Sequence, residues 1–111
     1  MDQEWETIGR LHAWLEQANQ LPPEQAVLLR MLKLTEETGE VAQAIIGATG
    51  QNPRKGTTHN WHDVQAELCD VIVTAMVALR TLTPTAEEVF TAHLDGVAKR
   101  SLAQPPAEAS G

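Results

Sequence analysis

The stretch that decides the fold is residues 61–82, which read WHDVQAELCDVIVTAMVALRTL. Apolar residues recur there every three or four positions, which predicts one long helix. Asn60 is placed to cap its first turn, where the carboxylate of Asp63 suits the helix dipole. The apolar residues fall on two sides of this helix. One side carries Val64, Leu68, Val71, Ala75 and Leu79, and the other carries Val73, Met76 and Val77. Both sides need covering, and a second subunit would cover what the chain itself does not.

Three more segments have a helical period, namely 3–19, 23–48 and 85–102. Prolines separate the first two, and Pro23 suits the first turn of the second. Thr83-Pro84 ends the long helix, and Thr85 stands three residues before Glu88, the spacing of a capping box. The apolar residues expected to face the core of the second helix are Val27, Met31, Leu34, Val41 and Ile45, and Trp5 and Trp14 are expected in the core as well.

The fold class expected from these segments is all-α, a four-helix bundle completed by oligomerisation. Residues 1–102 form one domain, because 111 residues leave no room for a second. Residues 47–60 are rich in glycine and small polar residues and form the longest loop. Residues 103–111 contain Pro105-Pro106 and only small or polar side chains, so we expect a disordered tail.

The overall charge limits the partners of this protein. Fifteen acids against eight Lys and Arg give a net charge of −7, which disfavours nonspecific binding to nucleic acid. No apolar run is long enough to span a bilayer and the first residues do not resemble a signal peptide, so we expect no membrane partner and a cytoplasmic location. Cys69 is the single cysteine, which excludes an internal disulfide and a cysteine-rich zinc site.

Two acidic clusters lie within the apolar helices. Glu36, Glu37 and Glu40 belong to segment 23–48, and Glu67 and Asp70 belong to segment 61–82. Residues three or four apart share a helix face, so each cluster places like charges side by side, which destabilises a helix. At about 100° per residue, Glu37 and Glu40 flank one apolar stripe and Glu67 and Asp70 flank the other. Packing the two helices together would bring these four carboxylates into one pocket, with Glu36 further round.

Carboxylate ligands favour Mg²⁺, with Mn²⁺ as a substitute, over zinc or haem. A di-iron bundle would need a Glu-x-x-His motif, which neither cluster contains. His59 and His62 have ligand-like spacing, but no further histidine or cysteine nearby completes a zinc set, so a capping or surface role is favoured. The competing interpretation is that the acids form solvated helix faces. The strongly apolar run that follows Asp70 argues against it.

Five cations are candidates for binding phosphate, and each has a simpler interpretation. Arg54 and Lys55 are adjacent in the loop, where they would contact phosphate or stand exposed at its tip. Lys33 precedes Glu37 by one turn and would pair with it or bind phosphate. Lys99 and Arg100 end the last helix, where cations also interact favourably with the helix dipole.

The stretch KLTEETGEVA at 33–42, followed by ELCDV at 67–71, resembles the Glu-Glu-x-x-Glu plus Glu-x-x-Asp signature of MazG-like nucleotide pyrophosphohydrolases. The resemblance covers about half of the chain. It implies an all-α bundle completed as a homodimer or a dimer of dimers. Transferred by position, it makes Glu37, Glu40, Glu67 and Asp70 ligands of Mg²⁺. Glu36 would assist a second ion or the attacking water, and a carboxylate near the ion, Glu36 or Glu37, would act as a general base.

The implied reaction cleaves a nucleoside triphosphate, ribo or deoxyribo, between its α and β phosphates, giving the monophosphate and pyrophosphate. Such an enzyme would remove noncanonical or excess nucleotides from the pool. Two alternatives remain open: a phosphoribosyl-ATP pyrophosphohydrolase-like enzyme, and a noncatalytic helical oligomerisation module whose acids bind metal only structurally. No segment beyond Arg100 matches a base-reading element, so the base preference is open.

Overall fold

The structure, a computed structural model that describes residues 2–102, contains four α-helices. They are α1 (Asp2–Ala18), α2 (Pro23–Thr49), α3 (Trp61–Leu82) and α4 (Ala86–Leu102). Within this part of the chain there is no strand, which confirms the all-α class, and no helix has the length and apolar character needed to cross a membrane. The expected tail, 103–111, lies outside the described residues. The expected helices are confirmed with end shifts of no more than one residue.

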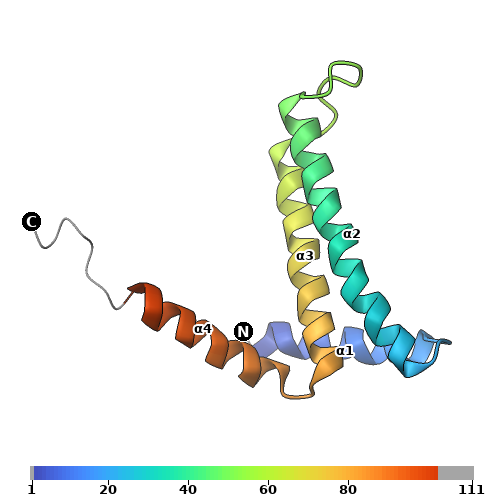
Figure 1. Ribbon diagram of the computed structural model, residues 1–111, viewed down its shortest axis with the longest axis vertical. Coiled ribbons are helices and arrows are strands. Elements are labelled where there is room, and N and C mark those ends of the chain that lie inside the picture. Colours follow the sequence, from blue (N-terminus) through green and yellow to red (C-terminus); the bar gives the residue numbers. More distant parts are fainter. Residues whose placement is uncertain (1, 103–111) are drawn as a thin grey trace, which may run out of the picture.

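Helices α2 and α3 form a long antiparallel hairpin, and α1 crosses its base (Figure 1). Pro23 opens α2, and Gly50 ends it in a left-handed conformation, with φ of 66° and its N–H donated to the Ile46 carbonyl. The capping of α3 is reciprocal. The Asn60 side chain accepts from the Asp63 N–H at 3.0 Å, and the Asp63 carboxylate accepts from the Asn60 N–H at 3.0 Å. These local signals fix where the hairpin turns.

The loop between α2 and α3 folds back onto the end of α2 at Gly47. The Thr58 N–H donates to the Gly47 carbonyl at 3.0 Å. A Cβ added at Gly47 would lie 2.0 Å from the His59 Nδ1 and 2.5 Å from the Thr58 Oγ1. The absence of a side chain at Gly47 therefore permits the close approach of the loop.

The hydrophobic core lies at the base of the hairpin, where α1, α3 and α4 meet. Trp5, Ile8, Val77 and Ala86 form its buried cluster, and the Trp5 and Phe90 rings pack with centroids 6.1 Å apart. Trp5 is thus confirmed as a core residue. Val77 was expected on the side of α3 that a second subunit would cover, but it is buried because α1 crosses α3 at this point.

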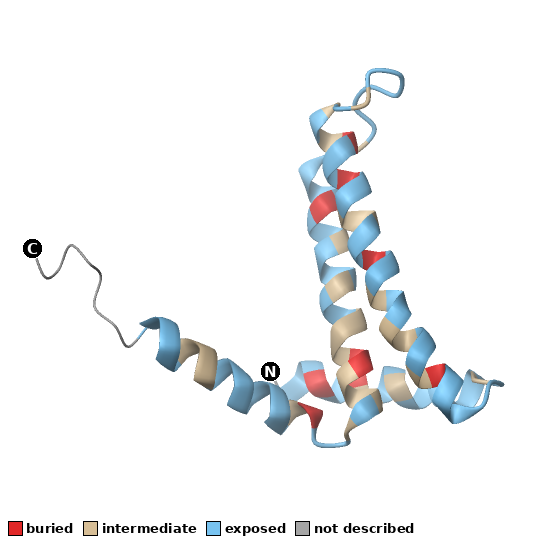
Figure 2. Cartoon of the chain, in the orientation of Figure 1, coloured by how far each residue is buried: buried red, intermediate tan, exposed pale blue. Residues whose placement is uncertain are grey.

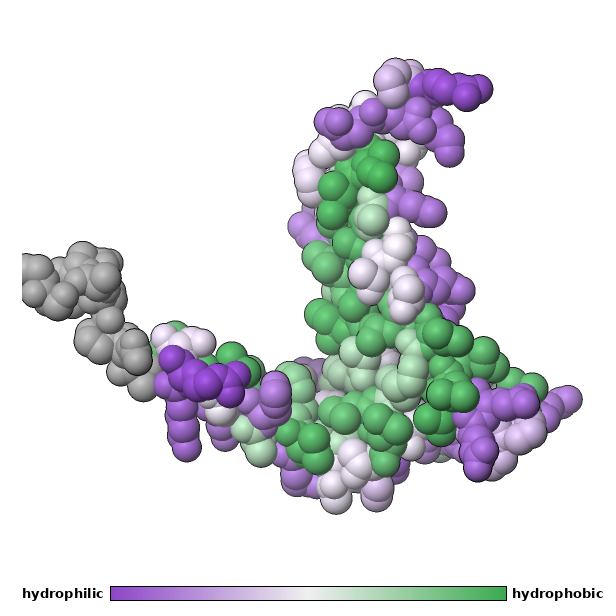
Figure 3. Space-filling model, viewed as in Figure 1, coloured by the Kyte–Doolittle hydropathy of each residue, from purple (hydrophilic) through white to green (hydrophobic). Residues whose placement is uncertain are grey.

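Most residues of the single chain are exposed or only partly buried (Figure 2), and many large apolar residues are among the exposed ones. The radius of gyration is 18.4 Å, against about 13 Å for a compact chain of this length. Apolar residues gather along the hairpin and its base in Figure 3. Three residues expected in the core, namely Trp14, Ile45 and Leu68, are exposed instead. Ile45 and Leu68 lie on hairpin surface that no other helix within residues 2–102 covers, and Trp14 lies on an exposed side of α1.

Helix α4 extends away from the hairpin and contacts the base of α3 near its own first residues (Figure 1). The expected capping box at its start is not formed. The Thr85 hydroxyl lies 2.9 Å from the Thr83 hydroxyl, and the Thr85 N–H donates to that same Thr83 oxygen at 3.1 Å. A local turn therefore precedes α4 in place of a side-chain cap.

Candidate metal and ligand site

The two acidic clusters meet between α2 and α3. Glu37 from α2 and Glu67 and Asp70 from α3 each offer a carboxylate oxygen, and these three oxygens lie within 4.8 Å of one another. Glu37 also belongs to a second group with Glu36 and Glu40, whose oxygens lie within the same distance. The pairing of α2 and α3 thus brings together acids from distant parts of the chain. Glu37 is common to both groups.

Burial distinguishes Glu37 and Glu67 from an ordinary solvated helix face, whereas Glu36 and Asp70 are exposed. Glu37 is only 8% exposed and is the one charged residue in the buried class among residues 2–102. The Glu67 Oε2 is also buried and has no hydrogen-bond partner within the described chain. A buried carboxylate oxygen without a partner is costly unless a cation compensates it. The donor set consists of hard oxygen ligands, which fit Mg²⁺ or Mn²⁺.

Lys33 neutralises part of this charge from within α2. Its Nζ lies 2.8 Å from the Glu36 Oε1 and 3.4 Å from the Glu37 Oε1. Hydrogen bonding to Glu36, followed by that to Glu37, raises the pKa of Lys33. The expected pairing with Glu37 is confirmed, and the nearer partner is Glu36. Glu40, Glu67 and Asp70 form no ion pair anywhere in residues 2–102.

The other four candidate cations lie away from the acids of their own chain. Arg54 and Lys55 are in the exposed loop beyond Thr49, and about 13 Å of helix separates Thr49 from Glu40. Lys99 and Arg100 end α4, which points away from the hairpin (Figure 1). Within the described chain none of the four forms an ion pair with the five acids. A second subunit would be needed to bring them to the site.

An apolar cavity of about 490 Å³ lies where α1, α2 and α3 meet. Leu11 and Leu15 of α1, Leu29 of α2 and Val73 and Val77 of α3 form most of its apolar wall. Its polar lining residues are Asn19, Arg30, Lys33 and Thr74. Its volume is typical of pockets that hold small ligands. No pattern in the sequence indicates this cavity, because its walls come from three helices whose crossing the periodicity does not specify.

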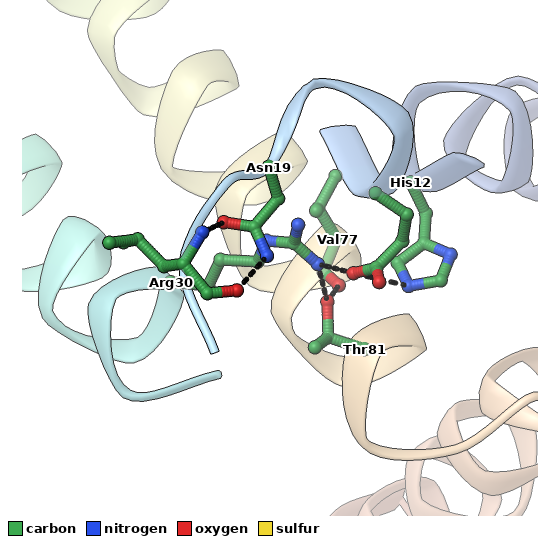
Figure 4. Close-up of polar contacts among 7 residues, drawn as sticks. His12, Asn19, Arg30, Val77 and Thr81 are labelled. Carbon is green, nitrogen blue, oxygen red and sulfur yellow. Dashed lines mark hydrogen bonds and ion pairs between the residues drawn. The ribbon is translucent and has the colours of Figure 1, made fainter. Parts of the chain in front are cut away.

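Arg30 is held at this cavity by a polar network (Figure 4). Its Nη1 donates to the Glu16 Oε1 at 2.6 Å and to the Thr81 Oγ1 at 3.1 Å. The Thr81 hydroxyl in turn donates to the Val77 carbonyl at 2.8 Å. The His12 Nε2 lies 3.6 Å from the same Glu16 oxygen. Burial, together with the charge of Arg80, lowers the pKa of His12. The network joins α1, α2 and α3 and fixes the guanidinium, which sequence analysis did not single out.

Comparisons with protein-family models, with curated proteins and with solved structures find no match for this chain.

Proposed function

We propose that this protein is a Mg²⁺-dependent nucleoside triphosphate pyrophosphohydrolase of the MazG-like type. The observation that carries the proposal is the convergence of Glu37, Glu67 and Asp70, with a buried and unpartnered oxygen on Glu67. Asp70 is exposed, but acids on an ordinary solvated helix face would not be buried as Glu37 and the Glu67 Oε2 are. The sequence signature that suggested a metal site thus comprises residues that the fold brings together.

Glu37, Glu67 and Asp70 would hold the ion, and Glu40 adds a carboxylate beside Glu37. When bound, Mg²⁺ neutralises phosphate charge and makes an attacking water more acidic. Glu36 is exposed and its Oε1 is paired with Lys33 at 2.8 Å, so its Oε2 would accept the proton of that water. The Lys33 ammonium would then exchange a carboxylate partner for a phosphate oxygen. Each of these groups is on the face between α2 and α3 or next to it.

The proposal includes a homodimer or a dimer of dimers. The exposed apolar residues of the hairpin support it, among them Leu28, Leu32, Ile46, Leu68 and Ile72. Contiguous exposed apolar surface of this kind marks an interaction site. A symmetric partner that covers the hairpin would also supply the core that a single open chain lacks.

The isosteric variant Asp70→Asn tests the catalytic role against a purely structural one. It keeps the shape of the side chain and removes one carboxylate. We expect turnover of nucleoside triphosphates to fall about 100-fold or more, with helical content and molar mass retained. Asp95→Asn, on the exposed face of α4, is the matched control and should keep full turnover. If Asp70→Asn keeps its turnover, or changes only stability and assembly, the proposed function is wrong.

A further inference from the structure

The apolar cavity between α1, α2 and α3 borders the acidic site at Lys33. Lys33 lines the cavity and also contacts Glu36 and Glu37. On α3, Thr74 lines the cavity and stands four residues after Asp70, a rise of about 6 Å. A molecule whose anionic end lies at the acids therefore has this cavity within reach of its other end.

The lining of the cavity defines the chemistry of that other end. Most of the wall is aliphatic, with Leu11, Leu15 and Val77 among its residues, so it suits a group with apolar faces. The exception is Arg30, which is pinned by Glu16 and Thr81. A guanidinium has five N–H groups, and the hydrogen bonds of Arg30 to Glu16 and Thr81 both use Nη1. The Nε and Nη2 donors have no partner within residues 2–102, and they are available to an acceptor at the cavity.

We infer that this cavity is the nucleobase subsite and that Arg30 is its specificity-determining residue. The inference rests on the proposed function, because it takes the triphosphate to lie at the acids. A nucleobase has apolar faces and an edge that carries carbonyl or ring-nitrogen acceptors. The aliphatic wall contacts the faces, and Arg30 donates to an acceptor on the edge. Because Glu16 and Thr81 already hold the guanidinium, little conformational entropy is lost when the base binds.

Two variants and a base-free probe test this assignment. Ala18 is an exposed residue that lines the cavity, so Ala18→Phe adds bulk there while the Arg30 side chain itself is retained. Arg30→Met removes the donors but also breaks the hydrogen bonds to Glu16 and Thr81. Because that loss could itself disturb the packing of the helices, Ala18→Phe is needed as a second, independent variant. Arg10→Met removes an exposed cation of α1 that does not line the cavity, and it serves as the control.

Calorimetric affinities would be measured with Mg²⁺ for two probes, an α,β-methylene nucleoside triphosphate and inorganic tripolyphosphate. Both cavity variants should weaken the nucleotide about tenfold or more and leave tripolyphosphate unchanged. The control should change neither affinity. Unchanged nucleotide affinity in Ala18→Phe would overturn the subsite, as would a change in molar mass, which would show that a second copy fills the cavity. If the wild-type protein binds and cleaves no nucleotide, the proposed function itself is overturned together with the subsite.

Discussion

Replacing Glu67 with glutamine should stabilise the protein without metal and destabilise it with metal, relative to the wild type. The Glu67 Oε2 is buried without a partner, and Glu67 shares a 4.8 Å cluster with Glu37 and Asp70. Glutamine keeps the shape and polarity of the side chain but removes its charge. Without a cation, this change relieves repulsion. With a cation, it removes a ligand.

The size of the effect follows from the distance between the carboxylates. The carboxylate oxygens lie within 4.8 Å of one another, and at that upper limit two unit charges repel by about 0.9 kcal/mol at the dielectric of water and by about 3.5 kcal/mol at an effective dielectric of 20. Since the site is partly buried, we expect Glu67→Gln to raise the free energy of unfolding by about 1 to 3 kcal/mol in the absence of metal. Mg²⁺ at 100 times its dissociation constant would stabilise the wild type by about 2.7 kcal/mol. The variant should gain much less, so the order of stability reverses.

Urea unfolding measures both states, once with a chelator and once with saturating Mg²⁺, at one protein concentration. Glu6→Gln is the control, because Glu6 is an exposed carboxylate outside the cluster, and it should respond to Mg²⁺ as the wild type does. Equal stabilisation of wild type and Glu67→Gln by Mg²⁺ would refute the reasoning. So would a variant that is less stable than the wild type in the chelator.

Two further predictions concern the loop and the α1 network. Gly47→Ala should lower the free energy of unfolding by about 1 to 3 kcal/mol, because its Cβ would meet His59 and Thr58. Gly39→Ala, which has open space at its Cβ, should instead raise it by about 0.5 to 1 kcal/mol, and equal effects in urea unfolding would contradict the role of the loop contact. The lowered pKa of His12 means that the folded state releases this proton more readily than the unfolded chain, so stability should fall as the pH drops below about 6.5 toward the folded pKa. His12→Gln should flatten this dependence between about pH 7.5 and about pH 5.5, and an unchanged slope of the urea midpoint against pH would show that another group is responsible.

The helices could be predicted from sequence because their signals are local. Pro23 opens α2, Asn60 and Asp63 cap α3, and Thr83-Pro84 ends it. The side of α3 that faces the core was predicted less accurately than the ends of the helices. Leu68 was expected in the core of the chain but is exposed, and Val77 was expected on the side left for a second subunit but is buried, since burial depends on where α1 crosses α3. That crossing depends on tertiary packing, which the periodicity of a single segment does not specify.

The acidic cluster could be predicted because its formation requires only that two helices pack by their apolar sides. Glu37, Glu67 and Asp70 meet as expected, whereas Glu40 was expected with them and instead groups with Glu36 and Glu37. The cavity and the hydrogen bonds of Arg30 involve residues from α1, α2 and α3, so no pattern within one segment could indicate them. A weak signal was present, since Arg30 stands three residues before Lys33 and shares its face of α2.

The most direct test of the central claim is the product analysis of the reaction. Purified protein would be incubated with ribo- and deoxyribonucleoside triphosphates, with and without Mg²⁺, and the nucleotide and phosphate products would be separated. The account predicts metal-dependent release of nucleoside monophosphate and pyrophosphate, and loss of both in Asp70→Asn. Release of nucleoside diphosphate and orthophosphate, or no turnover of any nucleotide with Mg²⁺ present, would contradict it.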